Sequence, residues 1–154
     1  MHDGFIASTG TLRYSPQLAG GGHGRRDGGS TLWWLIVDCD PELGRYLRHQ
    51  YLLGHRRTRS LQGPLWGPHI SVIRGETPPR MEAWKRGDGD AVEFVYDPRP
   101  QQTDGYVWYP VRCEAVLDLR VALGLPREPE PGLHLTIGND KHAEADPAGT
   151  PRRA

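Results

Sequence analysis

The stretch GPHISVIRGE, residues 67–76, decides how this chain is interpreted, because it places a histidine and a hydroxyl in an apolar, β-branched run. In a β-strand, residues i and i+2 point to the same face. His69, Ser71 and Ile73 therefore share one face, while Ile70 and Val72 line the other. The pattern predicts a strand with one buried face and one face that carries reactive groups.

A second stretch of the same kind, GLHLTIGND at residues 132–140, places His134 and Thr136 on one face. The order strand, helix, loop, H-x-[S/T] strand also occurs twice. Sliding the chain by 74 positions lays Trp34 on Trp108, among other matches. We interpret the chain as a duplication that brings two histidines face to face across a cleft.

Strand and helix signals fill most of the chain around these two stretches. Further strands are expected from β-branched and aromatic content at residues 31–40, 91–97 and 106–113. Helices are expected at residues 41–54, where Pro41 follows a capping aspartate, at 114–124, and as a short piece around 81–86. Residues 98–105 are expected to be a connecting loop.

These elements predict an α+β fold with two pseudo-symmetric lobes. Each lobe is expected to be an antiparallel sheet with helices on its outer face, and the active-site cleft is expected between the lobes. The lobes, at about residues 32–75 and 105–139, belong to a single domain at 32–139. The Gly-, Ser- and Arg-rich residues 1–31 and the polar residues 140–154 are expected to be flexible.

The overall composition limits the possible partners. The chain has 154 residues with 19 basic and 19 acidic side chains, so no bulk attraction to long nucleic acid or to an anionic membrane is expected. No apolar run has the length of a membrane span, and the first residues lack a secretory signal. We expect a cytoplasmic protein with no obligate protein partner. The two cysteines, Cys39 and Cys113, are expected to be reduced and buried, with a disulfide as the alternative.

The four residues of the two motifs suit the chemistry of a phosphodiester. Imidazole titrates near neutral pH, so one histidine can accept a proton while the other donates one. The hydroxyls of Ser71 and Thr136 can donate hydrogen bonds to the non-bridging phosphate oxygens. We therefore predict His69, Ser71, His134 and Thr136 as the catalytic residues of a phosphodiesterase that needs no metal and no cofactor. Which histidine is the base stays open.

A zinc site is the alternative reading of the same histidines, with Cys39 as a third ligand. Against it, the two histidines carry hydroxyl partners where a ligand cluster usually has carboxylate neighbours.

Aromatic and basic residues could hold a nucleotide beside the histidines. Tyr14, Trp66 and Trp108 are candidates to stack on bases. Trp34 and Trp108 turn toward the histidines if their strand neighbours pack in the core, although core tryptophans are common. Local positive charge could come from six arginines, namely Arg13, Arg56, Arg57, Arg59, Arg74 and Arg112. The basic loop HRRTR at 55–59 could equally be a solvated loop.

Two H-x-[S/T] motifs on strands of duplicated lobes resemble the two-histidine (2H) phosphoesterase superfamily, whose members act on 2′,3′-cyclic phosphates and RNA ends without a metal. More closely, the segments GTLRYSP, WWLIVDCDPELGRYLRHQY, PLWGPHISVIRGE, VEFVYD, YVWYPVRCE and LHLTIGN resemble the phage anti-CBASS nucleases. This resemblance implies cleavage of the 3′–5′ linkages of cyclic di- and trinucleotide signals, in evasion of a bacterial antiphage defence within the host cytoplasm. It also implies that Tyr14 packs on a bound base.

Two other functions use the same residues. An RNA-end phosphodiesterase would open 2′,3′-cyclic phosphates, although a neutral chain lacks the extended basic surface that large RNAs favour. A non-catalytic module would bind and sequester a cyclic nucleotide, although such a module needs no matched acid and base.

Overall fold

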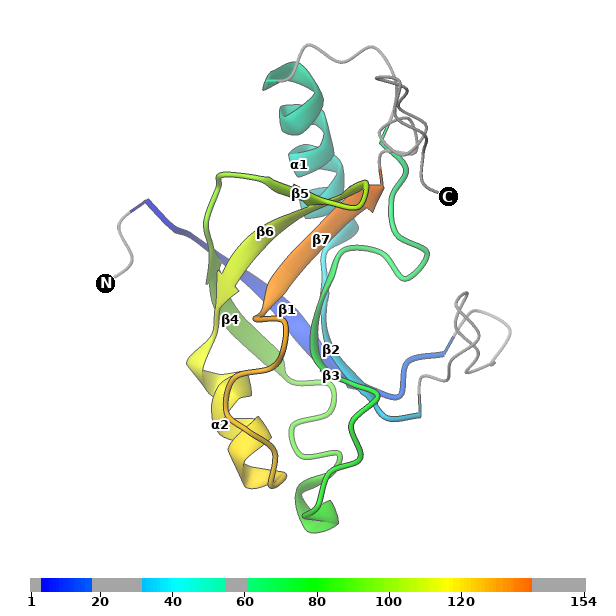
Figure 1. The fold of residues 1–154 in the computed structure, drawn as a ribbon, viewed down its shortest axis with the longest axis vertical. Coiled ribbons are helices and arrows are strands. Elements are labelled where there is room, and N and C mark those ends of the chain that lie inside the picture. The colour runs from blue at the N-terminus through cyan, green and yellow to red at the C-terminus, as the bar shows by residue number, and fades with distance from the viewer. Residues whose placement is uncertain (1–3, 18–31, 55–60, 140–154) are drawn as a thin grey trace.

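The computed structural model describes residues 4–17, 32–54 and 61–139, and its strands form one antiparallel sheet (Figure 1). The strands are β1 (Ile6–Tyr14), β2 (Trp34–Cys39), β3 (His69–Arg74), β4 (Ala91–Tyr96), β5 (Gln101–Thr103), β6 (Tyr106–Arg112) and β7 (His134–Asn139). The helices are α1 (Pro41–Gly54) and α2 (Glu114–Ala122), and the short expected helix is a single 3₁₀ turn, η1 (Met81–Ala83).

Six of the strands close into a barrel. Their order is β4-β1-β2-β3-β7-β6, and β4 pairs with β6 to complete the ring. Among the described strands, β5 pairs with β6 alone, at residues 106–108, whereas β4 pairs with residues 111 and 112 of β6. Closure gives every strand of the ring a partner on both edges, so the six-stranded sheet has no free edge.

The expected architecture of two lobes with helices on their outer faces is therefore wrong. The strands of both halves belong to one closed six-stranded barrel, and the described residues form only two α-helices. The error has a specific cause. Residues Ile6–Tyr14 lie in the segment expected to be flexible, but they form β1, which pairs with β2 on one side and β4 on the other. Without β1, the two halves looked separate.

The order of elements nevertheless occurs twice around the barrel. The first half runs β1, β2, α1, β3, and the second runs β4, β6, α2, β7, with the small strand β5 inserted. The halves meet where β3 pairs with β7 and where β1 pairs with β4. In Figure 1 the two helices lie at opposite ends of the barrel. Helix α1 packs against β7 and helix α2 against β3, so each helix contacts the other half's motif strand.

The hydrophobic core fills the interior of the barrel. Alternate residues of the strands point inward and are almost fully buried, as the alternation of a closed sheet requires. They include Leu35 and Val37 from β2, Ile70 from β3, Val107 and Tyr109 from β6, and Leu135 and Ile137 from β7. Helix side chains such as Leu47 and Val116 join the same core.

Both motif strands carry a β-bulge at the same place. On β3, Ser71 pairs with Ile36 and Ile73 with Leu35, so Val72 is an extra residue. On β7 the equivalent extra residue is Ile137, directly after Thr136. A bulge bends its strand and re-aims the neighbouring side chains. Each hydroxyl residue of the two motifs thus immediately precedes a bulge.

The expectations for residues 18–31, 55–60 and 140–154, including Arg56, Arg57 and Arg59, lie outside the described residues. Of the helices that are described, none is both long and apolar enough to cross a membrane.

Candidate active site

The pairing of β3 with β7 brings the four predicted catalytic residues together. His69 is the direct partner of Thr136, and the next pair is Ile70 with Leu135. Continuing that register places Ser71 opposite His134. Directly paired residues lie on the same face of a sheet, with diagonal neighbours about 7–8 Å apart. Because Ile70 and Leu135 point into the core, all four motif side chains point out of the barrel on one shared face.

Both histidine rings are held by the same hydrogen bond. His69 Nδ1 lies 2.8 Å from the carbonyl oxygen of Gly67, and His134 Nδ1 lies 2.8 Å from that of Gly132. A carbonyl oxygen can only accept, so Nδ1 of each ring carries the proton. Nε2 is therefore the nitrogen free for proton transfer in both histidines. The glycine two residues before each histidine fixes the same tautomer twice.

The surroundings of His69 favour its neutral form. Burial is the main cause that lowers the pKa of His69, and the nearby positive charges of Arg74 and His134 lower it further. The carbonyl of Gly67 and the carboxylate of Asp38 act in the opposite direction without reversing the shift. A histidine whose pKa lies below the ordinary value of about 6.5 is neutral at pH 7. His69 is thus prepared to accept a proton.

Each histidine packs on the tryptophan that the repeat predicted. The rings of Trp34 and His69 lie 5.3 Å apart edge to face, and those of Trp108 and His134 lie 5.5 Å apart. Both tryptophans therefore turn toward the histidines. Trp34 is only 2% exposed and its Nε1 donates to Ser71 Oγ at 3.0 Å. Trp108 is half-buried, and its Nε1 donates to Thr103 of β5.

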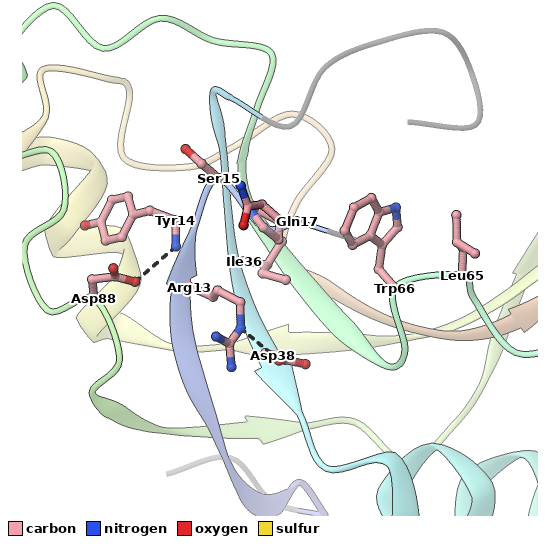
Figure 2. Close-up of a pocket in the computed structure, with 10 residues that line it drawn as sticks. Arg13, Tyr14, Ser15, Gln17, Ile36, Asp38, Leu65, Trp66 and Asp88 are labelled. Carbon is pink, nitrogen blue, oxygen red and sulfur yellow. Dashed lines mark hydrogen bonds and ion pairs between the residues drawn. The ribbon is translucent and has the colours of Figure 1, made fainter. Parts of the chain in front are cut away.

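A cavity of about 590 Å³ adjoins the His69 side of this face (Figure 2). It is lined by Arg13, Tyr14, Ser15, Pro16, Gln17, Ile36, Asp38, Leu65, Trp66 and Asp88. Two of these residues, Ile36 and Asp38, pair directly with Ser71 and His69, so the cavity begins beside the motif. Its volume falls within the usual range for small-molecule sites.

Within the cavity, Arg13 and Asp38 form an ion pair at 3.0 Å on neighbouring strands. In Figure 2, Trp66 lies above and to the right of this ion pair. Its ring packs edge to face on Trp34, with ring centres 5.3 Å apart. Trp66 is half-buried, which leaves part of its ring accessible from the cavity. The predicted stacking residue Trp66 therefore lies one aromatic ring away from His69.

Tyr14 has a different setting. Its side chain is 4% exposed, its ring packs edge to face on Trp84, and its hydroxyl donates to the carbonyl oxygen of Arg86. Figure 2 shows the ring directed away from Trp66. Stacking of Tyr14 on a base would require the ring to leave this packing.

Of the predicted arginines that the structure describes, Arg13 lines the cavity and Arg74 lies close to His69. Arg13 pairs with Asp38, the guanidinium of Arg74 lies 5.6 Å from the centre of the Trp34 ring, and that of Arg112 lies 5.9 Å from the centre of the Phe5 ring. Arg74 follows the β3 bulge and so holds positive charge close to His69.

The zinc alternative lacks the geometry it needs. Cys39 is part of the barrel core and its thiol points to the carbonyl of Val37, whereas the histidines point outward. The three side chains do not converge. No group of three metal-ligating side chains gathers anywhere in residues 4–17, 32–54 and 61–139.

Sequence reasoning did not identify Ile36 and Asp38 as neighbours of the motif. Both belong to the expected strand at 31–40, but their place beside Ser71 and His69 follows from the pairing of β2 with β3. The alternation in LWWLIVDC assigns both residues to the face of Trp34, which the repeat places toward the histidines, but it does not show which motif residue each one pairs with.

Comparisons with protein-family models, with curated proteins and with solved structures find no match to this chain.

Proposed function

We propose that this protein is a metal-independent phosphodiesterase that cleaves 3′–5′ linkages of cyclic di- and trinucleotides. One observation carries the proposal: two histidines with the same fixed tautomer expose Nε2 on one sheet face, each beside a hydroxyl across the strand pair. A general acid and a general base on the same face are what in-line displacement at phosphorus requires.

In the first step, His69 acts as the base. Its neutral imidazole accepts the proton of the attacking oxygen, either the ribose 2′-hydroxyl or a water, at Nε2. The attacking oxygen forms a bond to phosphorus as the bond from phosphorus to the 5′ oxygen breaks. The depressed pKa of His69 supports this assignment, since the base must be unprotonated at neutral pH.

His134 then serves as the acid. Protonated at both nitrogens, it donates the Nε2 proton to the departing 5′ oxygen, so one proton enters and one leaves the site. The hydroxyls of Ser71 and Thr136 donate to the non-bridging oxygens, where negative charge grows during the displacement. Trp34 donates to Ser71 Oγ, which leaves the hydroxyl hydrogen of Ser71 free to point at the phosphate.

The cavity beside His69 supports a small nucleotide substrate. Its volume of about 590 Å³ suits a base and ribose, and the accessible ring of Trp66 can stack on the base. The balanced charge of the chain also favours a small anionic ligand over a long polyanion. A cyclic nucleotide signal fits this combination better than a folded RNA.

The decisive experiment incubates the protein in EDTA with 3′,3′-cyclic GMP-AMP and, separately, with a 2′,3′-cyclic mononucleotide, and follows products by chromatography. We expect cleavage of the cyclic dinucleotide. His69→Gln and His134→Gln should each lower the rate about 10²- to 10⁴-fold, because each removes a general acid or base. His49→Gln, on the exposed side of α1, is the matched control and should keep the full rate.

The other outcomes replace the proposal. Cleavage of the mononucleotide alone would indicate an RNA-end phosphodiesterase. Binding of the dinucleotide without product would indicate a sequestering module. Full activity in both histidine variants would exclude the mechanism.

A further inference from the structure

The two bulges next to the catalytic hydroxyls each present a backbone carbonyl to an arginine. The pairing of β3 with β7 is short and covers only the start of each strand. Beyond it, the carbonyl oxygens of the bulge residues Val72 and Ile137 need other partners, because a bulge residue is left out of the regular ladder. In both strands an arginine side chain supplies the hydrogen bond.

Arg120 of α2 serves the bulge on β3. Its Nη1 donates to the carbonyl of Val72 at 2.8 Å. The guanidinium is 1% exposed and also binds both carboxylate oxygens of Glu76, while its Nε donates to the carbonyl of Pro126. A buried arginine with this many fixed bonds can hold the bulge in one conformation.

Arg48 of α1 serves the bulge on β7. Its Nη1 donates to the carbonyl of Ile137 at 3.0 Å. The guanidinium lies against Gly63 and Gly44, where an added Cβ would come within 3.1 Å of Nη1. Burial lowers the pKa of Arg48, so the guanidinium sits in a partly desolvated site. The glycines leave the space that the side chain needs to reach β7.

We propose that Arg48 and Arg120 are paired positioning residues, each of which holds the bulge that aims the catalytic hydroxyl of the opposite half. Arg48, from the first half, sets Thr136 through Ile137. Arg120, from the second half, sets Ser71 through Val72. The proposal rests on the proposed function for its effect on rate, but the positioning itself is a property of the folded chain.

The crossed arrangement has a mechanical consequence. The carbonyl of Val72 belongs to the peptide unit that joins Val72 to Ile73, so holding it limits rotation of the backbone one residue after Ser71. The same holds for Thr136 and Ile137. Displacement of a catalytic group by about 1 Å can cost on the order of 100-fold in rate. Loss of either arginine should therefore lower the rate of the chemical step more than substrate binding.

The kinetic test uses Arg48→Met, with Arg45→Met on the same helix as the matched control, since Arg45 is exposed and pairs with Glu42. We expect Arg48→Met to lower kcat about 10- to 100-fold with KM for cyclic GMP-AMP within about twofold. Arg48→Lys should recover most of the rate, because the contact with β7 uses a single N–H of Arg48, which donates to the carbonyl of Ile137. Equal loss in the control, or a change confined to KM, would overturn the proposal.

The crossed pairing gives a sharper kinetic test. In a Thr136→Ala background, Arg48→Met should cause almost no further loss, whereas in a Ser71→Ala background the two losses should multiply. Arg120→Lys should cause almost no further loss in the Ser71→Ala background, whereas its loss should multiply with that of Thr136→Ala. Multiplying losses in every combination would mean that the arginines act on stability alone.

An activity-independent measurement separates this proposal from the proposed function. In amide NMR spectra, Arg48→Met should shift the signals of residues 136–138 and leave those of residues 71–73 in place. If wild-type protein cleaves no nucleotide but these shifts occur, the positioning stands and the proposed function fails. If both sets of signals move together, or neither moves, the positioning proposal fails whatever the activity.

Discussion

At the scale of single residues, the site depends on which ring nitrogen of each histidine carries its proton. A glycine carbonyl two residues upstream holds Nδ1–H in both, and this leaves Nε2 of both rings on the outer face of the barrel. The histidines differ in what surrounds them. His69 packs on the buried Trp34 beside Arg74, and this setting keeps it neutral. The neighbours of His69, and not its motif, therefore lower its pKa.

The lowered pKa of His69 predicts the acidic limb of the dependence of kcat/KM on pH. The base works only when neutral, so kcat/KM should fall as pH drops through the pKa of His69, which lies below the ordinary value of about 6.5. Proton NMR of the ring Hε1 signal, assigned by its loss in His69→Gln, should give a midpoint below 6.5. A midpoint above 6.5 would remove the argument that His69 is the base.

The same shift should make the stability of the folded protein fall at acidic pH. The unfolded chain protonates His69 near pH 6.5, whereas the folded chain resists protonation, so wild-type protein loses stability as pH falls from about 6.5 toward the folded-state pKa. His69→Gln lacks this loss. The free energy of unfolding, measured in urea at pH 7.5 and 5.5, should fall less between the two pH values for the variant than for wild type. A constant difference between the two proteins would contradict the shift.

At the scale of elements, the barrel requires β1 to lie very close to β2 at Gly10. Gly10 on β1 pairs with Cys39 of β2 and with Val92 of β4. An added Cβ at Gly10 would lie 2.5 Å from Val37 Cγ1 and 2.9 Å from the backbone oxygen of Asp38. Such contacts cannot be relieved by rotating a flexible side chain.

Gly10→Ala should therefore destabilise the protein by about 1–3 kcal/mol, since overpacking outweighs the smaller entropic gain from losing a glycine. The measurement is the free energy of unfolding in urea. Gly54→Ala, at the end of α1 with nothing within 4 Å, is the control and should leave stability nearly unchanged. An unchanged midpoint for Gly10→Ala would show that β1 and β2 separate more easily than the packing implies.

Most helices and strands could be predicted because neighbouring residues carry the signal, as a helix start or as alternation of apolar and polar residues. Pro41 after Asp40 marks the start of α1, and alternation marks β3, β6 and β7. The strand β1 was missed because a glycine-rich stretch follows it and dominated the composition of residues 1–31. Strand β5 was missed because its three residues are polar and exposed. The joining of both halves into one barrel depends on pairing between distant strands, for which local pattern carries no signal.

The four motif residues could be identified without the correct architecture for a related reason. A histidine in an apolar strand, with a hydroxyl two residues later, needs only the strand period to share a face. Their convergence follows from the register of β3 against β7, which the duplication anticipated. The cavity beside them could not be anticipated, since it is formed by residues 13–17, 36, 38, 65, 66 and 88, which come from four separate segments.

At the scale of the whole molecule, the closed barrel keeps solvent and reagents away from the side chains in its core. The reactivity of the two buried cysteines therefore reports whether the barrel stays closed. Cys39 and Cys113 are 3% and 4% exposed and occupy equivalent places in the two halves. Cys39 is the last residue of β2, and Cys113 directly follows β6. Burial, with the nearby Asp38 carboxylate, raises the pKa of Cys39 to about 12, and burial raises the pKa of Cys113 as well. Both thiols are protonated as well as inaccessible at pH 8, so neither is the nucleophilic thiolate.

Iodoacetamide at pH 8 should therefore leave both thiols of the folded protein unmodified over a time in which an exposed control, Glu128→Cys, reacts fully at its new cysteine. In 6 M guanidinium chloride all cysteines should react, and mass spectrometry counts them. Because alkylation requires the barrel to open, slow reaction in native buffer should speed up in Gly10→Ala at Cys39, which pairs directly with the altered residue. Rapid modification of wild-type protein would mean that the ring of strands opens readily, and the fixed register that aligns His69 with Thr136 would then be present for only part of the time.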